Sequence, residues 1–116
     1  MPATIYGTNG PNVLLGTDGP DVIVGLGGGD IIRSFAGNDL ICAGAGADIV
    51  VADSGADTVL GGGGGDGIVG GSGDDALIGG SGDDAIDGGL DSDVCNGGPH
   101  VSGDSAAGCE LVAGVP

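Results

Sequence analysis

The stretch GGSGDDALIGGSGDDAID, residues 70–87, contains one nine-residue phrase twice. GGSGDDALI is followed at once by GGSGDDAID, so nearly every position recurs after nine residues. The chain has 31 glycines among 116 residues, and glycine loses more conformational entropy on ordering than any other residue. A repeat of this kind therefore needs an interaction that recurs with it and offsets the lost entropy.

The nine-residue register extends in both directions from this stretch. It runs from residue 7 to residue 96 without insertion or deletion and forms ten blocks. Position four is glycine in blocks one to nine and Asp91 in block ten. Position six is Asn12 in block one and aspartate in all the others, while position eight is aliphatic until Cys95. This constancy argues against a flexible linker rich in glycine and aspartate.

Nine residues are too few for a helical repeat, but they suffice for one turn and one short strand. The glycine-rich positions one to six predict the turn. Positions seven to nine predict the strand, with position eight facing one way and its two neighbours the other. Two blocks complete one coil of a solenoid with two strands, so ten blocks give five coils. The predicted core is position eight: Leu14, Ile23, Ile32, Ile41, Val50, Val59, Ile68, Leu77, Ile86 and Cys95.

Blocks such as GGSGDDALI resemble the G-G-x-G-x-D-x-U-x repeat of the RTX, or hemolysin-type calcium-binding, family. The resemblance covers residues 7–96, and blocks seven to nine match the motif in full. It implies an all-β fold: a right-handed parallel β-roll, a solenoid like a β-helix, with two short strands per coil and calcium ions between stacked turns. The turns that depart from the motif are weaker candidate calcium sites, and they contain Thr8, Thr17, Ser34, Ala43, Ala52 and Asp91.

The position-six side chains would form two ladders, because successive blocks alternate between the two sides of the coil. Carboxylates one coil apart, roughly 5 Å, repel each other, and a hard divalent cation with oxygen ligands removes that repulsion. Five rungs leave four gaps in each ladder, so the two ladders could hold up to eight Ca²⁺ ions. We therefore expect the chain to fold on binding calcium and to be largely disordered in chelator. The candidate metal ligands are Asp21, Asp30, Asp39, Asp48, Asp57, Asp66, Asp75, Asp84 and Asp93, with Asn12 as a weaker one.

The charge of the chain narrows its partners. Seventeen acidic residues face one basic residue, Arg33, which gives a formal net charge of −16. Such a chain does not bind nucleic acid phosphates or anionic membrane surfaces, and it favours cations as partners. No apolar stretch is long enough for a membrane span. The start, MPATIYGTNG, lacks the features of a secretory signal peptide, so either the sequence is a mature or cloned segment or export uses a different route.

Positions seven and nine are predicted to face outward, yet twelve of these twenty positions are valine, leucine or isoleucine. The strand propensity of branched residues is one explanation. The other is that the outer faces are covered by another copy of the chain or by a partner. The twelve residues are Val13, Leu15, Val22, Val24, Ile31, Leu40, Ile49, Val51, Leu60, Val69, Ile78 and Val94.

The ends of the repeat complete the expected organisation. Residues 1–6 form an N-terminal capping strand with Ile5 inward, residues 7–96 form the roll, and residues 97–116 break the period as a C-terminal cap or tail. A disulfide between Cys95 and Cys109 would staple this cap and suits an extracellular protein, although two buried thiols are the alternative. Cys42, at an outward position, is expected to be free or to link two chains.

These observations favour a binding or structural role over catalysis. The chain has one histidine, His100, and no visible Ser-His-Asp or Cys-His constellation, so we expect no enzymatic activity. We expect a secreted, extracellular calcium-binding structural protein that associates with itself. The alternative is a calcium-triggered folding or secretion module of a larger RTX exoprotein. An ice-binding or surface-binding solenoid ranks last, because position three shows no regular ladder of threonine or asparagine.

Overall fold

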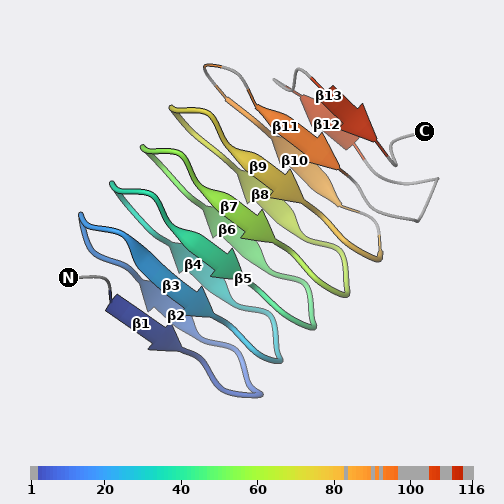
Figure 1. Ribbon diagram of the computed structural model, residues 1–116. Coiled ribbons are helices and arrows are strands. Elements are labelled where there is room, and N and C mark those ends of the chain that lie inside the picture. Colours follow the sequence, from blue (N-terminus) through green and yellow to red (C-terminus); the bar gives the residue numbers. More distant parts are fainter. Residues whose placement is uncertain are drawn as a thin grey trace.

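The computed structural model describes residues 3–82, 84–89, 91, 93–96, 105–107 and 111–113. In this part of the chain every regular element is a β-strand, and all strand pairs are parallel. Figure 1 shows two layers of strands stacked along one direction, with the first and last strands, Ala3–Tyr6 and Leu111–Ala113, at opposite ends of the stack. The predicted all-β solenoid with coils of eighteen residues is therefore confirmed.

The two layers are sheets built from alternate strands. The seven-stranded sheet contains, in spatial order, β1 (Ala3–Tyr6), β3 (Asp21–Val24), β5 (Leu40–Cys42), β7 (Thr58–Leu60), β9 (Ala76–Ile78), β11 (Val94–Asn96) and β13 (Leu111–Ala113). The six-stranded sheet contains β2 (Val13–Leu15), β4 (Ile31–Arg33), β6 (Ile49–Val51), β8 (Gly67–Val69), β10 (Ala85–Asp87) and β12 (Ser105–Ala107).

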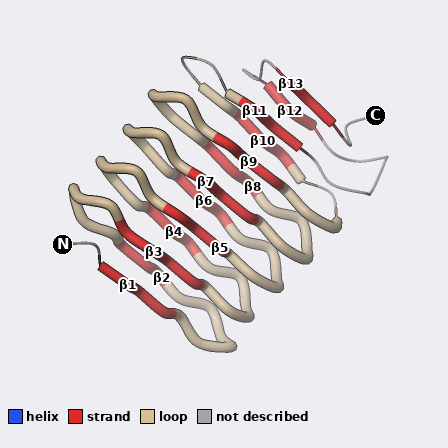
Figure 2. Tube along the Cα trace, viewed as in Figure 1, coloured by secondary structure: helices blue, strands red, loops and turns tan. Residues whose placement is uncertain are grey.

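The strand register follows the sequence repeat. Through the ten blocks each strand residue pairs with the residue eighteen positions later, as in the series Ile23, Ile41 and Val59. Most strands are three residues long and coincide with positions seven to nine of a block. The turns between them line both sides of the stack (Figure 2). The turns are therefore in register as well, and equivalent residues lie one above another.

A single file of side chains from each sheet fills the interior. All ten position-eight residues are buried, from Leu14 at 8% exposure to Ile23 at 0%. Ala43 and Ala52, from position one, complete this core, and Ile5 packs against it at the N-terminal end. The core prediction is confirmed, and its thinness fits a molecule only 14 Å across its shortest axis.

The outward-facing residues are where the alternation of the strands predicts them. Eight of the twelve predicted apolar residues are exposed: Val13, Leu15, Ile31, Leu40, Ile49, Leu60, Val69 and Val94. The other four, Val22, Val24, Val51 and Ile78, are half-buried. Tyr6 adds a large exposed side chain at the N-terminal end. Both outer faces of the solenoid are therefore largely apolar.

The ends differ in how well the sequence foretold them. Strand β1 is the predicted first strand. In the predicted C-terminal cap, β12 pairs with β10 and β13 pairs with β11, so both sheets continue for one more coil beyond the ten blocks. No helix in the described residues could span a membrane.

Candidate metal centre

Adjacent turns stack so closely that their backbones touch. From block three onward the position-four glycines have a positive φ, for example Gly64 at 91°. A methyl group on Gly64 would collide with the carbonyl group of Gly46, one coil earlier, at 2.7 Å from its carbon. Because L-residues disfavour this φ and no side chain fits between the turns, glycine recurs at this position.

The position-six aspartates are buried beneath these turns. All nine are between 0% and 3% exposed, and Asn12, their counterpart in block one, is half-buried. The structure thus brings each predicted acidic ligand into one of two ladders. The nine buried residues are Asp21, Asp30, Asp39, Asp48, Asp57, Asp66, Asp75, Asp84 and Asp93.

One oxygen of each carboxylate from Asp30 onward is used to hold the coils together. The backbone N–H of a position-six residue donates to Oδ1 of the aspartate one coil later, at 2.7 to 2.9 Å. For example, the N–H of Asp39 donates to Asp57 Oδ1 at 2.8 Å. Each aspartate therefore satisfies a buried donor of its neighbour.

The second carboxylate oxygen has no such partner in the stacked turns. Oδ2 is buried without a hydrogen bond in Asp30, Asp39, Asp48, Asp57, Asp66, Asp75 and Asp93. A methyl group added at Gly61 would lie 2.6 Å from Asp66 Oδ2 and 2.6 Å from the carbonyl oxygen of Gly79, one coil later. A carboxylate oxygen and a backbone carbonyl oxygen thus converge on one small space. Most buried oxygens in proteins are hydrogen-bonded, so these need a partner of another kind.

The same arrangement perturbs the acid–base properties of the ladder. Burial, together with the neighbouring carboxylates of Asp39 and Asp75, raises the pKa of Asp57 to about 7. Burial and the adjacent ladder carboxylates likewise raise the pKa of Asp66 and of Asp75 to about 7. The pKa of Asp39, Asp48 and Asp93 is also raised, chiefly by burial. A cation near these oxygens would relieve this cost of holding negative charges side by side.

These donors fit a hard cation such as Ca²⁺, which takes carboxylate and carbonyl oxygens as ligands. Within the described residues, however, no three histidine, cysteine or acidic side chains cluster around one point. A calcium site here would use one or two aspartate oxygens and complete its ligand set with backbone carbonyls. Glycine-rich turns supply such carbonyls, because no side chains shield them.

The first two blocks depart from this arrangement. The side chains of Asn12 and Asp21 accept hydrogen bonds from Thr8 and Thr17 of their own turns. Their departure from the motif makes these two turns weaker candidate sites, but it does not predict these contacts. The signal was Thr-x-Gly-Pro, which occurs only in blocks one and two.

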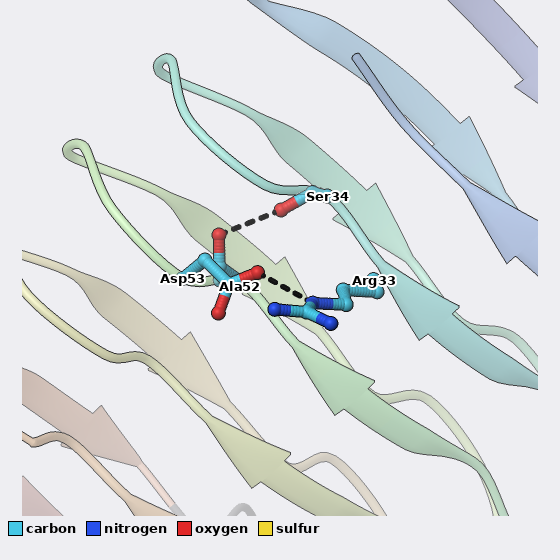
Figure 3. Close-up of polar contacts among 4 residues, drawn as sticks. All are labelled: Arg33, Ser34, Ala52 and Asp53. Carbon is cyan, nitrogen blue, oxygen red and sulfur yellow. Dashed lines mark hydrogen bonds and ion pairs between the residues drawn. The ribbon is translucent and has the colours of Figure 1, made fainter. Parts of the chain in front are cut away.

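The middle blocks, which lack glycine at position one, keep their turns in the same stack. Ser34, Ala43 and Ala52 are each 0% exposed. The hydroxyl of Ser34 donates to the carbonyl oxygen of Ala52, one coil later, at 2.9 Å (Figure 3). Small side chains therefore replace the first glycine without interrupting the solenoid.

The cysteines add one covalent constraint. Cys95 is disulfide-bonded and 1% exposed, whereas Cys42 is free and half-buried. Cys109, the predicted partner of Cys95, and His100 lie outside the described residues. The pairing of Cys95 with Cys109 therefore stays a prediction.

Comparison with known proteins agrees with the geometry. The family model of the RTX calcium-binding nonapeptide repeat (4 copies) matches residues 6–41, 34–68 and 69–99. A search of curated proteins finds no match to the chain. The matched residues cover most of the sequence and all ten blocks. The chain belongs to the RTX calcium-binding nonapeptide repeat family.

Proposed function

We propose that this calcium-binding repeat protein folds when Ca²⁺ binds between its stacked turns. The observation that carries the proposal is the row of buried aspartate oxygens without hydrogen-bond partners, each beside the next coil. Burying ionised carboxylates in this way costs free energy, and the raised pKa of Asp57, Asp66 and Asp75 expresses that cost. Bound Ca²⁺ would supply the positive charge that removes it.

The rest of the chain offers little to offset that cost. The core is a single file of aliphatic residues from each sheet, and the sequence contains one phenylalanine, one tyrosine and no tryptophan. Ordering 31 glycines opposes folding further. The proposed metal-free state is therefore largely unfolded at neutral pH.

A calcium titration followed by far-UV circular dichroism tests this proposal. We expect a cooperative gain of β-structure at roughly 10⁻⁴–10⁻³ M Ca²⁺, the range of extracellular calcium modules. Mg²⁺ at equal concentration is the control. It is a smaller ion that requires near-ideal octahedral geometry and gives up its water ligands reluctantly, so it suits such carbonyl-rich sites poorly. A β signal that is unchanged by chelator would contradict calcium-driven folding.

We propose an extracellular location for the folded protein. The disulfide of Cys95 supports it, since disulfides persist in oxidising compartments. A site of millimolar affinity would also stay empty at cytosolic calcium levels. Counting free thiols in protein recovered from the medium and from cells would test this. Protein found only inside cells, with three free thiols, would contradict it.

We propose a structural, non-catalytic role in which calcium-loaded copies associate through their outer faces. The exposed side chains of Val13, Ile31 and Ile49 form a continuous row on the six-stranded sheet, and they support this role. Calcium binding would also reduce the repulsion between chains of formal charge −16. Sedimentation velocity with and without Ca²⁺ measures the association. A calcium-folded monomer at all accessible concentrations would favour the module of a larger exoprotein instead.

A further inference from the structure

The turns of blocks one and two have a backbone shape of their own. From block three to block ten, position two has a positive φ, between 63° at Phe35 and 89° at Gly44. Thr8 and Thr17, at position two of the first two blocks, are outside this region, as are Gly10 and Gly19 at position four. The sequence explains the difference. Threonine is β-branched and resists a positive φ, and each glycine precedes a proline, which favours extended backbone.

This shape lets threonine hold the position-six side chain from within its own turn. The backbone N–H of Thr17 donates to Asp21 Oδ2 at 2.7 Å, and its hydroxyl donates to Asp21 Oδ1 at 2.8 Å. In block one, the N–H and hydroxyl of Thr8 donate to Asn12 Oδ1 at 2.8 and 3.1 Å. Each hydroxyl oxygen also accepts from the N–H of its position-four glycine at 3.2 Å.

The oxygens held in this way are the ones that face the next coil. A methyl group added at Gly16 would lie 2.6 Å from Asp21 Oδ2 and 3.0 Å from the carbonyl oxygen of Ser34. The equivalent space beside Gly25 is bounded by Asp30 Oδ2 at 2.7 Å and the Ala43 carbonyl oxygen at 2.5 Å. Asp30 Oδ2 has no hydrogen bond, whereas Asp21 Oδ2 already accepts one. The two spaces are alike in position but differ in whether their carboxylate oxygen needs a partner.

We propose that the first gap on each side of the solenoid is closed by threonine and takes no calcium. This inference rests on the proposed function, in which the later gaps hold calcium. Of the eight gaps between position-six residues, two lie above Asn12 and Asp21, which leaves six. The oxygens that face these six gaps without a hydrogen bond belong to Asp30, Asp39, Asp48, Asp57, Asp66 and Asp75.

The threonine turns would thus end the metal ladder with a coil whose position-six oxygens already accept hydrogen bonds. The position-six residues of these turns still bond to the next coil. The backbone N–H of Asn12 donates to Asp30 Oδ1 and that of Asp21 donates to Asp39 Oδ1, both at 2.8 Å. The first coil therefore keeps the same ladder hydrogen bonds to its neighbour as the later coils. Terminal repeats of solenoids commonly differ from internal ones in this capping role.

Counting calcium ions on the whole wild-type chain is the first test. Equilibrium dialysis against saturating Ca²⁺ should give six ions per chain from these gaps, or seven if Asp93 Oδ2, which also lacks a hydrogen bond, takes one beyond block ten. A count of eight or more would overturn the threonine-lock inference while leaving calcium-driven folding intact. A count of zero would overturn the proposed function itself, so the two failures are distinguishable.

An exchange of turns locates the effect. The variant Thr17→Gly with Pro20→Asp changes block two to GGDGDDVIV, and we expect it to bind one more ion than wild type. The reciprocal variant, Gly71→Thr with Asp74→Pro, changes block eight to GTSGPDALI, and we expect it to bind one ion fewer. Circular dichroism at saturating calcium verifies that each variant folds. Unchanged counts in two folded variants would overturn the inference.

A milder variant keeps the inference testable if either exchange prevents folding. Thr17→Val retains the shape of the side chain and the backbone N–H that bonds Asp21 Oδ2, but it removes the hydroxyl. We expect an unchanged ion count and faster hydrogen exchange at the amide of Gly19, which loses the acceptor that it bonds at 3.2 Å. An increased ion count would overturn the inference that the Thr17 N–H closes the gap, because that N–H still bonds Asp21 Oδ2 in this variant. Unchanged exchange at Gly19 would contradict the hydrogen bond from its N–H to the Thr17 hydroxyl.

Discussion

Two groups of turns share one register: those of blocks one and two and those of blocks seven to nine. They differ in how the oxygens of the position-six side chain are satisfied. In the first pair, Thr8 and Thr17 donate hydrogen bonds to the position-six side chain. In the later blocks the equivalent oxygens of Asp66 and Asp75 are buried and have no hydrogen bond. The comparison teaches that a Thr-x-Gly-Pro turn bonds its own position-six side chain, whereas a glycine-rich turn leaves one carboxylate oxygen of that side chain without a hydrogen bond.

The largest expected effect is a loss of stability when a position-four glycine is replaced, and it differs between the two kinds of turn because their backbone φ differs. Gly64→Ala places a methyl group against the carbonyl group of Gly46 at a φ of 91°. We expect a loss of more than about 1–3 kcal/mol in the free energy of unfolding from the φ strain alone, with the collision adding to it. Gly10→Ala is the matched control, because its methyl group would meet only Thr8 Oγ1 at 3.9 Å.

For Gly10→Ala we expect a change within about 0.5 kcal/mol. Urea unfolding of both variants at saturating calcium measures the difference. Equal losses in the two variants would mean that the turns of the first blocks are as tightly stacked as the later ones.

The second effect concerns the side chains at position six. Asp57→Ala leaves the buried N–H of Asp39 without its acceptor, which costs about 1–3 kcal/mol, and it should also remove one calcium ion. Asn12→Ala loses only bonds to the exposed Thr8, so we expect a smaller cost of about 0.5–1.5 kcal/mol and an unchanged ion count.

Calorimetric titration of these variants with Ca²⁺ gives both quantities. Asp57→Asn is a useful third variant, since it keeps an acceptor for Asp39 but removes the charge. Loss of an ion in the Asn12 variant would contradict the distinction between the two regions.

The third effect is a pH dependence that belongs to the later blocks. In chelator, Asp57, Asp66 and Asp75 have a pKa of about 7 in the folded state against 3.8 as the ordinary value. The folded state therefore binds more protons, and its stability rises as the pH falls from about 7 toward 3.8. Circular dichroism in chelator should show more β-structure at pH 5 than at pH 8.

The triple variant with asparagine at these three positions should lose most of this response, because the amides do not titrate. Asn12 already carries an amide in block one. A pH response that is undiminished in the triple variant would place its source outside the ladder.

The smallest effect concerns the surface of the middle blocks. Arg33 Nε donates to Asp53 Oδ2 at 2.8 Å, and the Arg33 guanidinium lies 4.8 Å from the centre of the Phe35 ring (Figure 3 shows the ion pair). The Arg33 side chain is 54% exposed, so we expect Arg33→Gln to cost no more than about 1 kcal/mol. The calcium count should not change. Loss of an ion in this variant would link the surface pair to the ladder.

The period of the sequence foretold the fold because it fixes which residues share a face. Once position eight is aliphatic in every coil, Ile23, Ile41 and Val59 must stack in one core, and the structure places them there. The acidic ladders follow from the same period, because position six also recurs at equivalent places in every coil. A nine-residue period therefore determines both the core and the set of candidate ligands.

The contacts of the ligands were not predictable in this way. The hydrogen bond from the N–H of Asp39 to Asp57 depends on how one turn is set on the next, which no local pattern encodes. The bonds from Thr17 to Asp21 depend on the φ of position two, and the strands β12 and β13 lie where the period has ended. Each of these needed the stacked backbone in three dimensions.

The constant register of eighteen residues makes the protein a molecular ruler. Because each residue of a strand pairs only with its counterparts one coil before and one coil after, removing residues 61–78 would join coils that already match, with each end left unchanged. Each such step would shorten the stack by one strand spacing, about 4.8 Å. The length of an array of this kind is thus counted in whole coils and can change by duplication or loss of eighteen residues, without any new contact having to be invented.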